Sequence, residues 1–276
     1  MKRFFTVASL VFFGAFFLSA AISIPTVEAA TYNFTYSTFF PPTHIQSKVP
    51  EAWAKEIEEL SKGQIKIQLF FGGSLTPAPQ IYDGVVKGIS DFGLSVLAYS
   101  PGRFPVLSAV DNPFGFNNAF VATRAINELN QKFKPKEVSD VHICYLFAHG
   151  PGILHTANKP VTKLEQVAGL KIRATGTTGA IARAMGAAAV SMSQGETYDA
   201  LKKNIADGTL VPIEALEGFK QAEVLKYTTY TYSCSYSQGF FVAMNLSKWN
   251  SLPPDLQKII TDVSKKYEDI TAKAWG

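Results

Sequence analysis

Strand-type and helix-type hydrophobic patterns alternate along nearly the whole chain after residue 30, and this alternation constrains the fold more than any other feature. Apolar residues recur at every second position in a half-buried strand, and at every third or fourth position in an amphipathic helix. The first half of this region predicts strands at residues 32–37, 65–69, 91–98 and 141–147. Between them the pattern predicts helices near residues 45–60, 77–87 and 119–132. Three strand–helix units in succession predict an α/β lobe.

Capping signals mark the starts of two predicted helices. Thr43 and Gln46 have the spacing of a capping box, in which two side chains satisfy free N–H groups at the start of a helix. Ser193 and Glu196 have the same spacing later in the chain. The first helix should end at Lys62-Gly63. Its core-facing residues are predicted to be Ile45, Val49, Trp53, Ile57 and Leu60.

The segment His149-Gly150-Pro151-Gly152 interrupts the pattern and predicts a first crossing to a second lobe. Beyond it, strands are predicted at residues 153–156, 170–173, 188–192, 228–233 and 239–245. Helices are predicted at residues 176–185, near 194–205, at 213–225 and from Pro253 onward. The expected organisation is lobe I from residues 30–148 plus about 234–276, and lobe II from residues 149–233.

Two α/β lobes joined by more than one crossing create a cleft. Ligands of open α/β sheets bind beyond the carboxyl ends of the strands, and hinged lobes can close around a small molecule. The pattern therefore predicts a two-lobed α/β protein with a ligand site between the lobes and hinge strands connecting them.

The N-terminal 29 residues have the pattern of an export signal peptide. Two positive charges, Lys2 and Arg3, precede an uncharged apolar run from Phe4 to Ile24, and small or apolar residues precede a cut after Ala29. We expect removal of residues 1–29 and a periplasmic location. The alternative is an uncleaved membrane anchor, because about 20 apolar residues can span a bilayer.

Charge and cysteine content exclude several classes of site. Without the signal peptide the chain has 24 basic and 21 acidic side chains and no basic run, so nothing indicates nucleic-acid binding. No Cys/His cluster or dinucleotide fingerprint indicates a metal or another cofactor. Cys144 and Cys234 either form a disulfide in an oxidising compartment or remain free thiols.

A set of short motifs resembles the solute-binding subunits of tripartite ATP-independent periplasmic (TRAP) transporters, of the C4-dicarboxylate-binding type. The central motif is Gly169-Leu170-Lys171-Ile172-Arg173. The others follow the order of that family over about residues 32–265, nearly all of the mature chain: Pro41-Pro42-Thr43-His44, Gly72-Gly73-Ser74-Leu75, Gly88-Ile89-Ser90-Asp91, Gly186-Ala187, Glu196-Thr197-Tyr198-Asp199-Ala200-Leu201, Asp207-Gly208 and Leu252-Pro253-Pro254-Asp255-Leu256-Gln257.

The resemblance implies a periplasmic-binding-protein-like fold whose ligand is delivered to a small and a large membrane subunit driven by an ion gradient. It also implies that Arg173 pairs with the ligand carboxylate. A guanidinium suits this role because its planar fork matches a carboxylate and stays charged. Lys159 and Val211 stand where some family members have an arginine and a polar residue. The set of residues that would bind both carboxylates of a dicarboxylate is therefore incomplete, and a monocarboxylate is expected.

Strand ends supply further candidate cleft residues. Aromatic rings can form apolar walls, and Tyr, His and Glu can satisfy ligand hydroxyls. For each of these residues, packing in the core or hinge is an equal alternative. They are Phe39, His44, Tyr99, Phe147, His149, Met192, Glu214 and Tyr236. Arg103, within Pro101-Gly102-Arg103-Phe104-Pro105, is expected to hold a loop together instead.

Two alternatives to a transport role are weighed against the sequence. An enzyme is not expected, because the chain has no GxSxG, HExxH or Walker motif. A membrane-tethered sensor domain of the same fold would follow if the N-terminus stayed uncleaved. The chain also stops at Trp275-Gly276 within a helical pattern, so the long C-terminal helix is expected to be truncated relative to the family. The expected assembly is a monomer.

Overall fold

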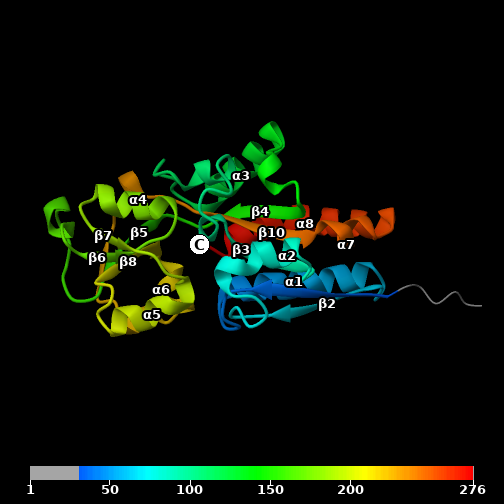
Figure 1. The fold of residues 1–276 in the computed structure, drawn as a ribbon, viewed down its shortest axis with the longest axis horizontal. Helices are drawn as coiled ribbons and strands as arrows, with labels where there is room; N and C mark the ends of the chain where they lie inside the picture. Colours follow the sequence, from blue (N-terminus) through cyan, green and yellow to red (C-terminus); the bar gives the residue numbers. More distant parts are fainter. Residues whose placement is uncertain (1–30, 276) are drawn as a thin grey trace, which may run out of the picture. The chain divides into compact units, whose positions relative to one another are not determined.

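A computed structural model describes residues 31–275, which contain two five-stranded sheets (Figure 1). The predicted signal peptide lies outside the described residues. The first sheet has the order β2-β1-β3-β10-β4 and comprises β1 (Tyr32–Thr38), β2 (Ile65–Phe70), β3 (Phe92–Val96), β4 (Val141–Ala148) and β10 (Gly239–Asn245). The second has the order β7-β6-β8-β5-β9 and comprises β5 (Gly152–Thr156), β6 (Lys171–Arg173), β7 (Ala188–Val190), β8 (Gly208–Pro212) and β9 (Tyr227–Thr229).

Helices cover both sheets, and we call each sheet with its helices a lobe. Lobe I contains the first sheet with α1 (Ile45–Leu60), α2 (Ile81–Val86), α3 (Ala119–Phe133), α7 (Leu246–Asn250) and α8 (Pro254–Lys273). Lobe II contains the second sheet with α4 (Thr177–Ala184), α5 (Gln194–Lys202) and α6 (Glu214–Gly218). The predicted α/β class and two-lobed fold are confirmed. Among residues 31–275, no helix is both long and apolar enough to cross a membrane.

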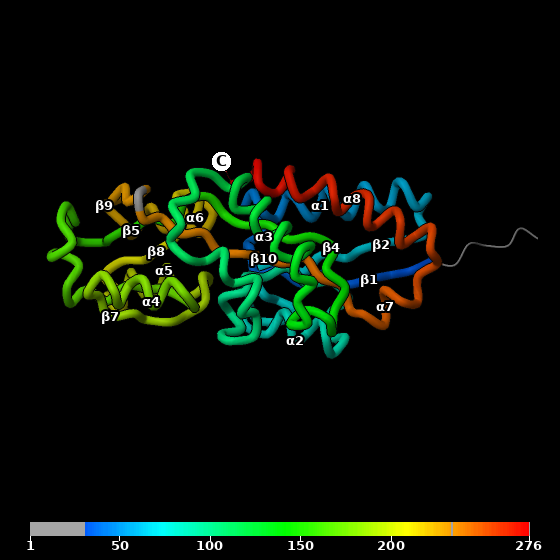
Figure 2. Tube along the Cα trace, turned by 90° about the horizontal axis from the view of Figure 1, so that it is seen from above, coloured from blue at the N-terminus to red at the C-terminus, as the bar shows by residue number. Residues whose placement is uncertain are grey.

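The core of lobe I follows from the period-two alternation of its strands. In β3, Phe92 faces α1, where it packs edge-on against Trp53 with ring centroids 5.3 Å apart. Phe241 of β10 faces the opposite side and packs against Tyr82 of α2. Helices α1 and α8 lie side by side (Figure 2), joined by a hydrogen bond from Trp53 Nε1 to Ser264. Burying each large ring stabilises the fold by roughly 2–3 kcal/mol.

Strand directions fix which strand ends face the cleft. In lobe I, β1 is parallel to β2 and β3, whereas β10 is antiparallel to β3 and β4. In lobe II, β6 is parallel to β7 and β8, whereas β5 is antiparallel to β8 and β9. The carboxyl ends of β1, β3 and β6 are followed by Phe39, Leu97 and Ala174 respectively. Ligand sites in such sheets lie beyond these ends.

Two segments carry the chain between the sheets and are hydrogen-bonded to each other. The first follows β4 at residues 149–151, and the second precedes β10 at residues 230–238. The N–H of Gly152 donates to the carbonyl of Tyr236 at 2.8 Å, and the Ser237 hydroxyl donates to the carbonyl of His149. These segments are the only covalent routes between the sheets within residues 31–275, which is the arrangement of a hinge.

Several local predictions were wrong, each for an identifiable reason. The helix predicted at 213–225 ends at Gly218, because Lys220 adopts a left-handed conformation (φ 56°) and a 3-10 turn follows at Gln221–Glu223. Strand β8 was missed, because its five residues are all buried and show no alternation. The strand predicted at 228–233 becomes the short β9 and a 3-10 turn at Tyr232–Cys234.

The two capping predictions had opposite outcomes. At α1 the N-cap is His44, whose Nδ1 accepts the N–H of Gln46, so the predicted Thr43 box does not form. At α5 the Ser193 and Glu196 capping box is confirmed. The ends of the predicted α1 core face, Ile45 and Leu60, are 49% and 53% exposed, while its middle residues are buried. Cys144 and Cys234 are free thiols.

Candidate functional site

A narrow cavity lies between the two lobes. Its volume, measured as the space that the centres of water molecules can reach, is about 40 Å³. The lobes approach closely beside it: a Cβ built on Gly176 of lobe II would lie 3.0 Å from Cβ of Ala98 in lobe I. Residues from both lobes and from both crossing segments line it: Phe39, Phe40, Val96, Tyr99, His149, Arg173, Thr175, Gln194, Val211, Pro212, Ala215, Phe219, Tyr236, Gln238, Phe240 and Trp275.

Arg173 supplies a buried positive charge to this cavity. It ends β6 and is only 4% exposed. Its Nε and Nη2 donate to the carbonyl of Met192 at 3.2 and 2.9 Å, and Nη2 lies 3.5 Å from the Tyr99 hydroxyl. Within residues 31–275 no carboxylate forms an ion pair with it. A buried charge without a counter-ion costs several kcal/mol, so this guanidinium is suited to an anion from outside.

The Glu196 carboxylate interacts with the charge of Arg173 but is already hydrogen-bonded to Ser193. Glu196 accepts hydrogen bonds from the N–H and hydroxyl of Ser193, which close the capping box of α5. These bonds, and to a smaller extent the charge of Arg173, lower the pKa of the Glu196 carboxyl. Because Glu196 is exposed to solvent, its interaction with the guanidinium is screened.

Tyr99 adds a neutral hydroxyl beside Arg173. It follows β3 of lobe I, and its oxygen accepts the backbone N–H of Gln194 in lobe II at 2.7 Å. Burial raises the pKa of the Tyr99 hydroxyl, an effect that the Arg173 charge partly opposes. Because the oxygen already accepts N–H groups, its own hydrogen is free to donate. Arg173 and Tyr99 together can therefore bind a carboxylate.

Aromatic rings form the apolar part of the cavity wall. Phe39 lies nearly parallel to Phe219 of lobe II (13°) and to Phe240 of β10 (14°), with ring centroids 6.4 and 6.5 Å away. Phe40 stacks on Phe39 at 4.3 Å, and Trp275 packs against Phe240 at 5.7 Å. Such flat walls favour a ligand with an apolar or aromatic body over a fully hydrated one.

His149 presents a ring nitrogen without a partner. It is 2% exposed, its Nδ1 lies 2.5 Å from the carbonyl of Gly150, and its Nε2 is buried and unpaired. Burial lowers the pKa of the imidazole to about 4, although the hydrogen bond to Gly150 opposes this shift. The ring is therefore neutral near pH 7. Tyr236 packs edge-on against it at 5.4 Å.

Five of the residues that the sequence singled out line this cavity: Phe39, Tyr99, His149, Arg173 and Tyr236. The other four do not. His44 lies behind the wall, against Phe40 and Phe219, and Phe147 is fully buried beneath Phe240. Met192 takes part through its carbonyl instead of its side chain. Glu214 lines two neighbouring grooves at the start of α6, and burial raises the pKa of its carboxyl.

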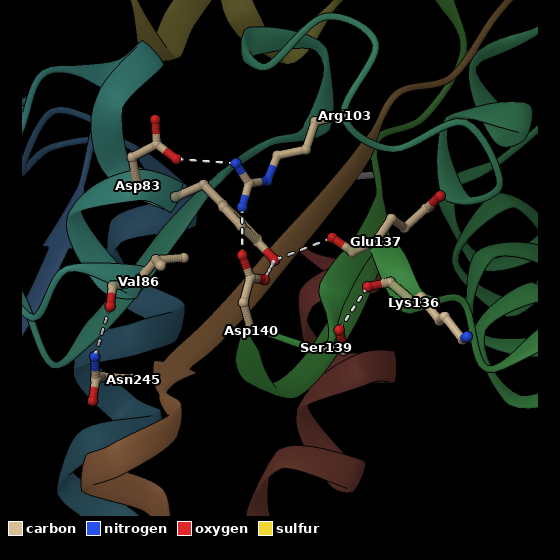
Figure 3. A network of polar contacts seen from close by, with 9 residues as sticks. Asp83, Val86, Arg103, Lys136, Glu137, Ser139, Asp140 and Asn245 are labelled. Carbon is tan, nitrogen blue, oxygen red and sulfur yellow. Dashed lines mark hydrogen bonds and ion pairs between the residues drawn. The ribbon is translucent and has the colours of Figure 1, made fainter.

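Arg103 holds a loop of lobe I together, as the sequence predicts. Its Nη1 donates to Asp83 at 3.1 Å and Nη2 to Asp140 (Figure 3). The guanidinium also lies 4.4 Å from the ring centroid of Tyr82. None of these groups lines the cavity. The exposed Lys159 does not line it either, whereas Val211 forms part of its apolar wall.

Sequence reasoning missed several polar residues of the lining. Gln194 follows the capping residue Ser193, and its Nε2 is buried without a partner. Gln238 lies in the second crossing segment and donates to the carbonyl of Thr175. The position of Gln194 after β7 was a usable signal, because chain leaving a strand end faces the cleft. Within residues 31–275 no group of three or more His, Cys, Asp or Glu side chains could hold a metal ion.

Comparison with known proteins places the chain among transport proteins. The family model of bacterial extracellular solute-binding proteins, family 7, matches residues 36–276. The 2,3-diketo-L-gulonate-binding periplasmic protein of Escherichia coli is 26% identical over 251 residues, which are 90% of this chain and 75% of that protein. A TRAP solute-binding protein of Desulfovibrio salexigens is 32% identical, with a TM-score of 0.75, and the match covers 89% of this chain and 76% of that one.

Two further structures are similar over nearly the same extent. A TRAP solute-binding protein of Rhodoferax ferrireducens in complex with benzoate has a TM-score of 0.84 at 27% identity, covering 89% of this chain and 78% of that one. One from Bordetella bronchiseptica with bound mandelate has a TM-score of 0.83 at 29% identity, covering 88% and 78%. These relatives are solute-binding proteins of transporters, not enzymes. The chain therefore belongs to the bacterial extracellular solute-binding proteins of family 7 and is a TRAP solute-binding subunit.

Proposed function

We propose that this protein captures a small organic monocarboxylate between its lobes, outside the cytoplasmic membrane, and delivers it to TRAP membrane subunits. The observation that carries the proposal is Arg173, a buried guanidinium without a carboxylate partner among the described residues. Benzoate and mandelate, the ligands of the two similar proteins, each have one carboxylate on an apolar body. The aromatic wall around Phe39 and Phe240 suits such a body.

A monocarboxylate fits better than a dicarboxylate for an electrostatic reason. Among the cavity-lining residues, Arg173 is the one Lys or Arg side chain. Val211 and Pro212 form part of the cavity wall and offer no side-chain hydrogen-bond donor. A second buried carboxylate would lack a cation, and desolvating it would cost several kcal/mol.

Replacing Arg173 by Ala tests the proposal. Removing one member of a buried charge pair costs about 2–5 kcal/mol, so the dissociation constant for a bound carboxylate should rise about 30-fold or more. Isothermal titration calorimetry with benzoate, mandelate and pyruvate measures this loss. The matched control is Arg183→Ala, which removes an exposed arginine of α4 and should leave affinity unchanged. Equal affinity in both variants would overturn the role of Arg173.

A further inference from the structure

We propose that His149 selects a ligand with a hydroxyl group, so that the natural solute is a hydroxy monocarboxylate with an apolar or aromatic body. The hydroxyl would donate to His149 Nε2 while the carboxylate pairs with Arg173. This inference rests on the proposed function and deepens it, because both groups belong to the same cavity.

The tautomer of His149 follows from its neighbour. A backbone carbonyl has no hydrogen to donate, so the close contact between Nδ1 and the carbonyl of Gly150 places the imidazole hydrogen on Nδ1. The ring is neutral near pH 7, because full burial disfavours the imidazolium. Nε2 therefore carries a lone pair and can only accept a hydrogen bond.

No described residue satisfies this acceptor. Three buried, unpaired polar atoms belong to cavity-lining residues within 31–275: His149 Nε2, Gln194 Nε2 and Trp275 Nε1. The last two are donors, and they match the oxygens of a carboxylate or hydroxyl. His149 Nε2 is the acceptor of the three and requires a donor. Leaving a buried acceptor unpaired costs about 1–3 kcal/mol, which a ligand hydroxyl would offset.

The neighbours of His149 hold its ring in an orientation from which Nε2 can accept a hydrogen bond from a ligand hydroxyl. The ring packs between Tyr236, Phe240 and Trp275, with centroids 5.4, 6.2 and 5.9 Å away. Its backbone is held too, because the carbonyl accepts from Ser237 and the N–H donates to Gln238. Held at Nδ1 and on its faces, the ring cannot rotate freely to satisfy Nε2 elsewhere. Site geometry of this kind rejects analogues that lack the matching hydroxyl.

Matched ligands test the inference on the wild-type protein. The probes are benzoate with the 2-, 3- and 4-hydroxybenzoates and their methoxy ethers, and phenylacetate with mandelate and O-methylmandelate. We expect at least one hydroxy acid to bind about tenfold or more tightly than both its deoxy and its methoxy counterpart, since only the hydroxyl can donate. If carboxylates bind through Arg173 but no hydroxy acid has this advantage, the inference fails and the proposed function stands. If no carboxylate binds at all, the proposed function itself fails.

Variants of His149 assign the advantage to this residue. His149→Phe should reduce the hydroxyl advantage, the ratio of affinities for a hydroxy acid and its deoxy counterpart, to about twofold or less. His149→Gln, which keeps an acceptor at the end of its side chain, should retain part of the advantage. The control is His142→Phe, in which the replaced ring stacks on Trp249 away from the cavity and the advantage should be unchanged. An advantage that persists in folded His149→Phe would overturn the assignment.

Discussion

At the scale of single residues, the backbone leaves no room for a side chain at Gly208 of β8. A Cβ built there would lie 2.3 Å from the carbonyl oxygen of His155 on the neighbouring strand β5. Methyl groups of Ile172 and Thr156 would lie 3.0 Å away. Gly208 therefore allows three strands of lobe II to pack against one another directly.

Gly208→Ala should destabilise the protein by about 1–3 kcal/mol or more, because the sheet must shift to accept one added methyl group. Urea unfolding followed by circular dichroism measures the change. Gly195→Ala is the matched control: its Cβ would meet nothing within 4 Å, and it lies in the first turn of α5. The control should be neutral or slightly stabilising. A Gly208→Ala variant as stable as this control would contradict the packing argument.

Residue-level reasoning from sequence located cavity-lining residues where one position has a chemical reason of its own. Arg173 was identified through the resemblance, and His149 through the break in composition around it. Gln238 and Phe219 were not identified, because each has an ordinary local pattern and reaches the cavity only through tertiary packing. Phe147 was singled out as a strand-end aromatic, but the register of β4 against β10 places it under Phe240.

At the scale of elements, one hydrogen bond joins the end of β3 to the start of α5 across the cleft. The Tyr99 oxygen accepts the N–H of Gln194, one of the first-turn N–H groups of α5 that have no partner within the helix. The same oxygen faces Arg173 Nη2. Tyr99 thus links lobe I to the start of α5 and to Arg173 in lobe II.

Tyr99→Phe should weaken the binding of benzoate or mandelate about tenfold, because the closed form loses this link and leaves an N–H unpaired. Calorimetry gives the affinity, and small-angle X-ray scattering should show a larger radius of gyration for the ligand-free variant. Tyr36→Phe is the control, since the Tyr36 hydroxyl is buried without a partner and its removal should not weaken binding. An affinity equal to wild type in Tyr99→Phe would exclude the link as a contributor to closure.

Element-level prediction worked where the apolar pattern extends over many residues and failed in short segments. Helix α1 and helix α8, of 16 and 20 residues, were recognised from apolar residues at three- and four-residue intervals. The region 208–225 was read incorrectly because β8 and α6 have only five residues each. There, tertiary packing decides the structure: a Cβ on Gly218 would meet the His44 ring of lobe I at 2.1 Å.

At the scale of the whole molecule, the histidines make stability depend on pH. All four histidines of the chain are in the described region, and burial lowers the pKa of each to about 4: His44, His142, His149 and His155. In the unfolded chain a histidine titrates near 6.5. Between these two values the unfolded state binds more protons than the folded state, so stability should fall as pH falls from about 6.5 to 4.

Two buried carboxyls act in the opposite direction but do not reverse the sign. Burial raises the pKa of Asp111 to about 7 and also raises the pKa of Glu214. These groups bind protons more readily in the folded state, so their contribution to stability falls as pH rises. The four histidines outnumber these two carboxyls, so unfolding still takes up protons near pH 5, and each net proton corresponds to about 1.4 kcal/mol per pH unit.

Urea unfolding at pH 7, 6 and 5 should therefore give a free energy of unfolding that decreases steadily, with the steepest loss below pH 6. His142→Phe should reduce the number of protons taken up on unfolding by up to one, and with it the slope of the unfolding free energy against pH. The variant removes one buried imidazole while keeping a ring against Trp249. A constant or increasing stability between pH 6.5 and 5 would mean that the histidines are protonated inside the folded protein.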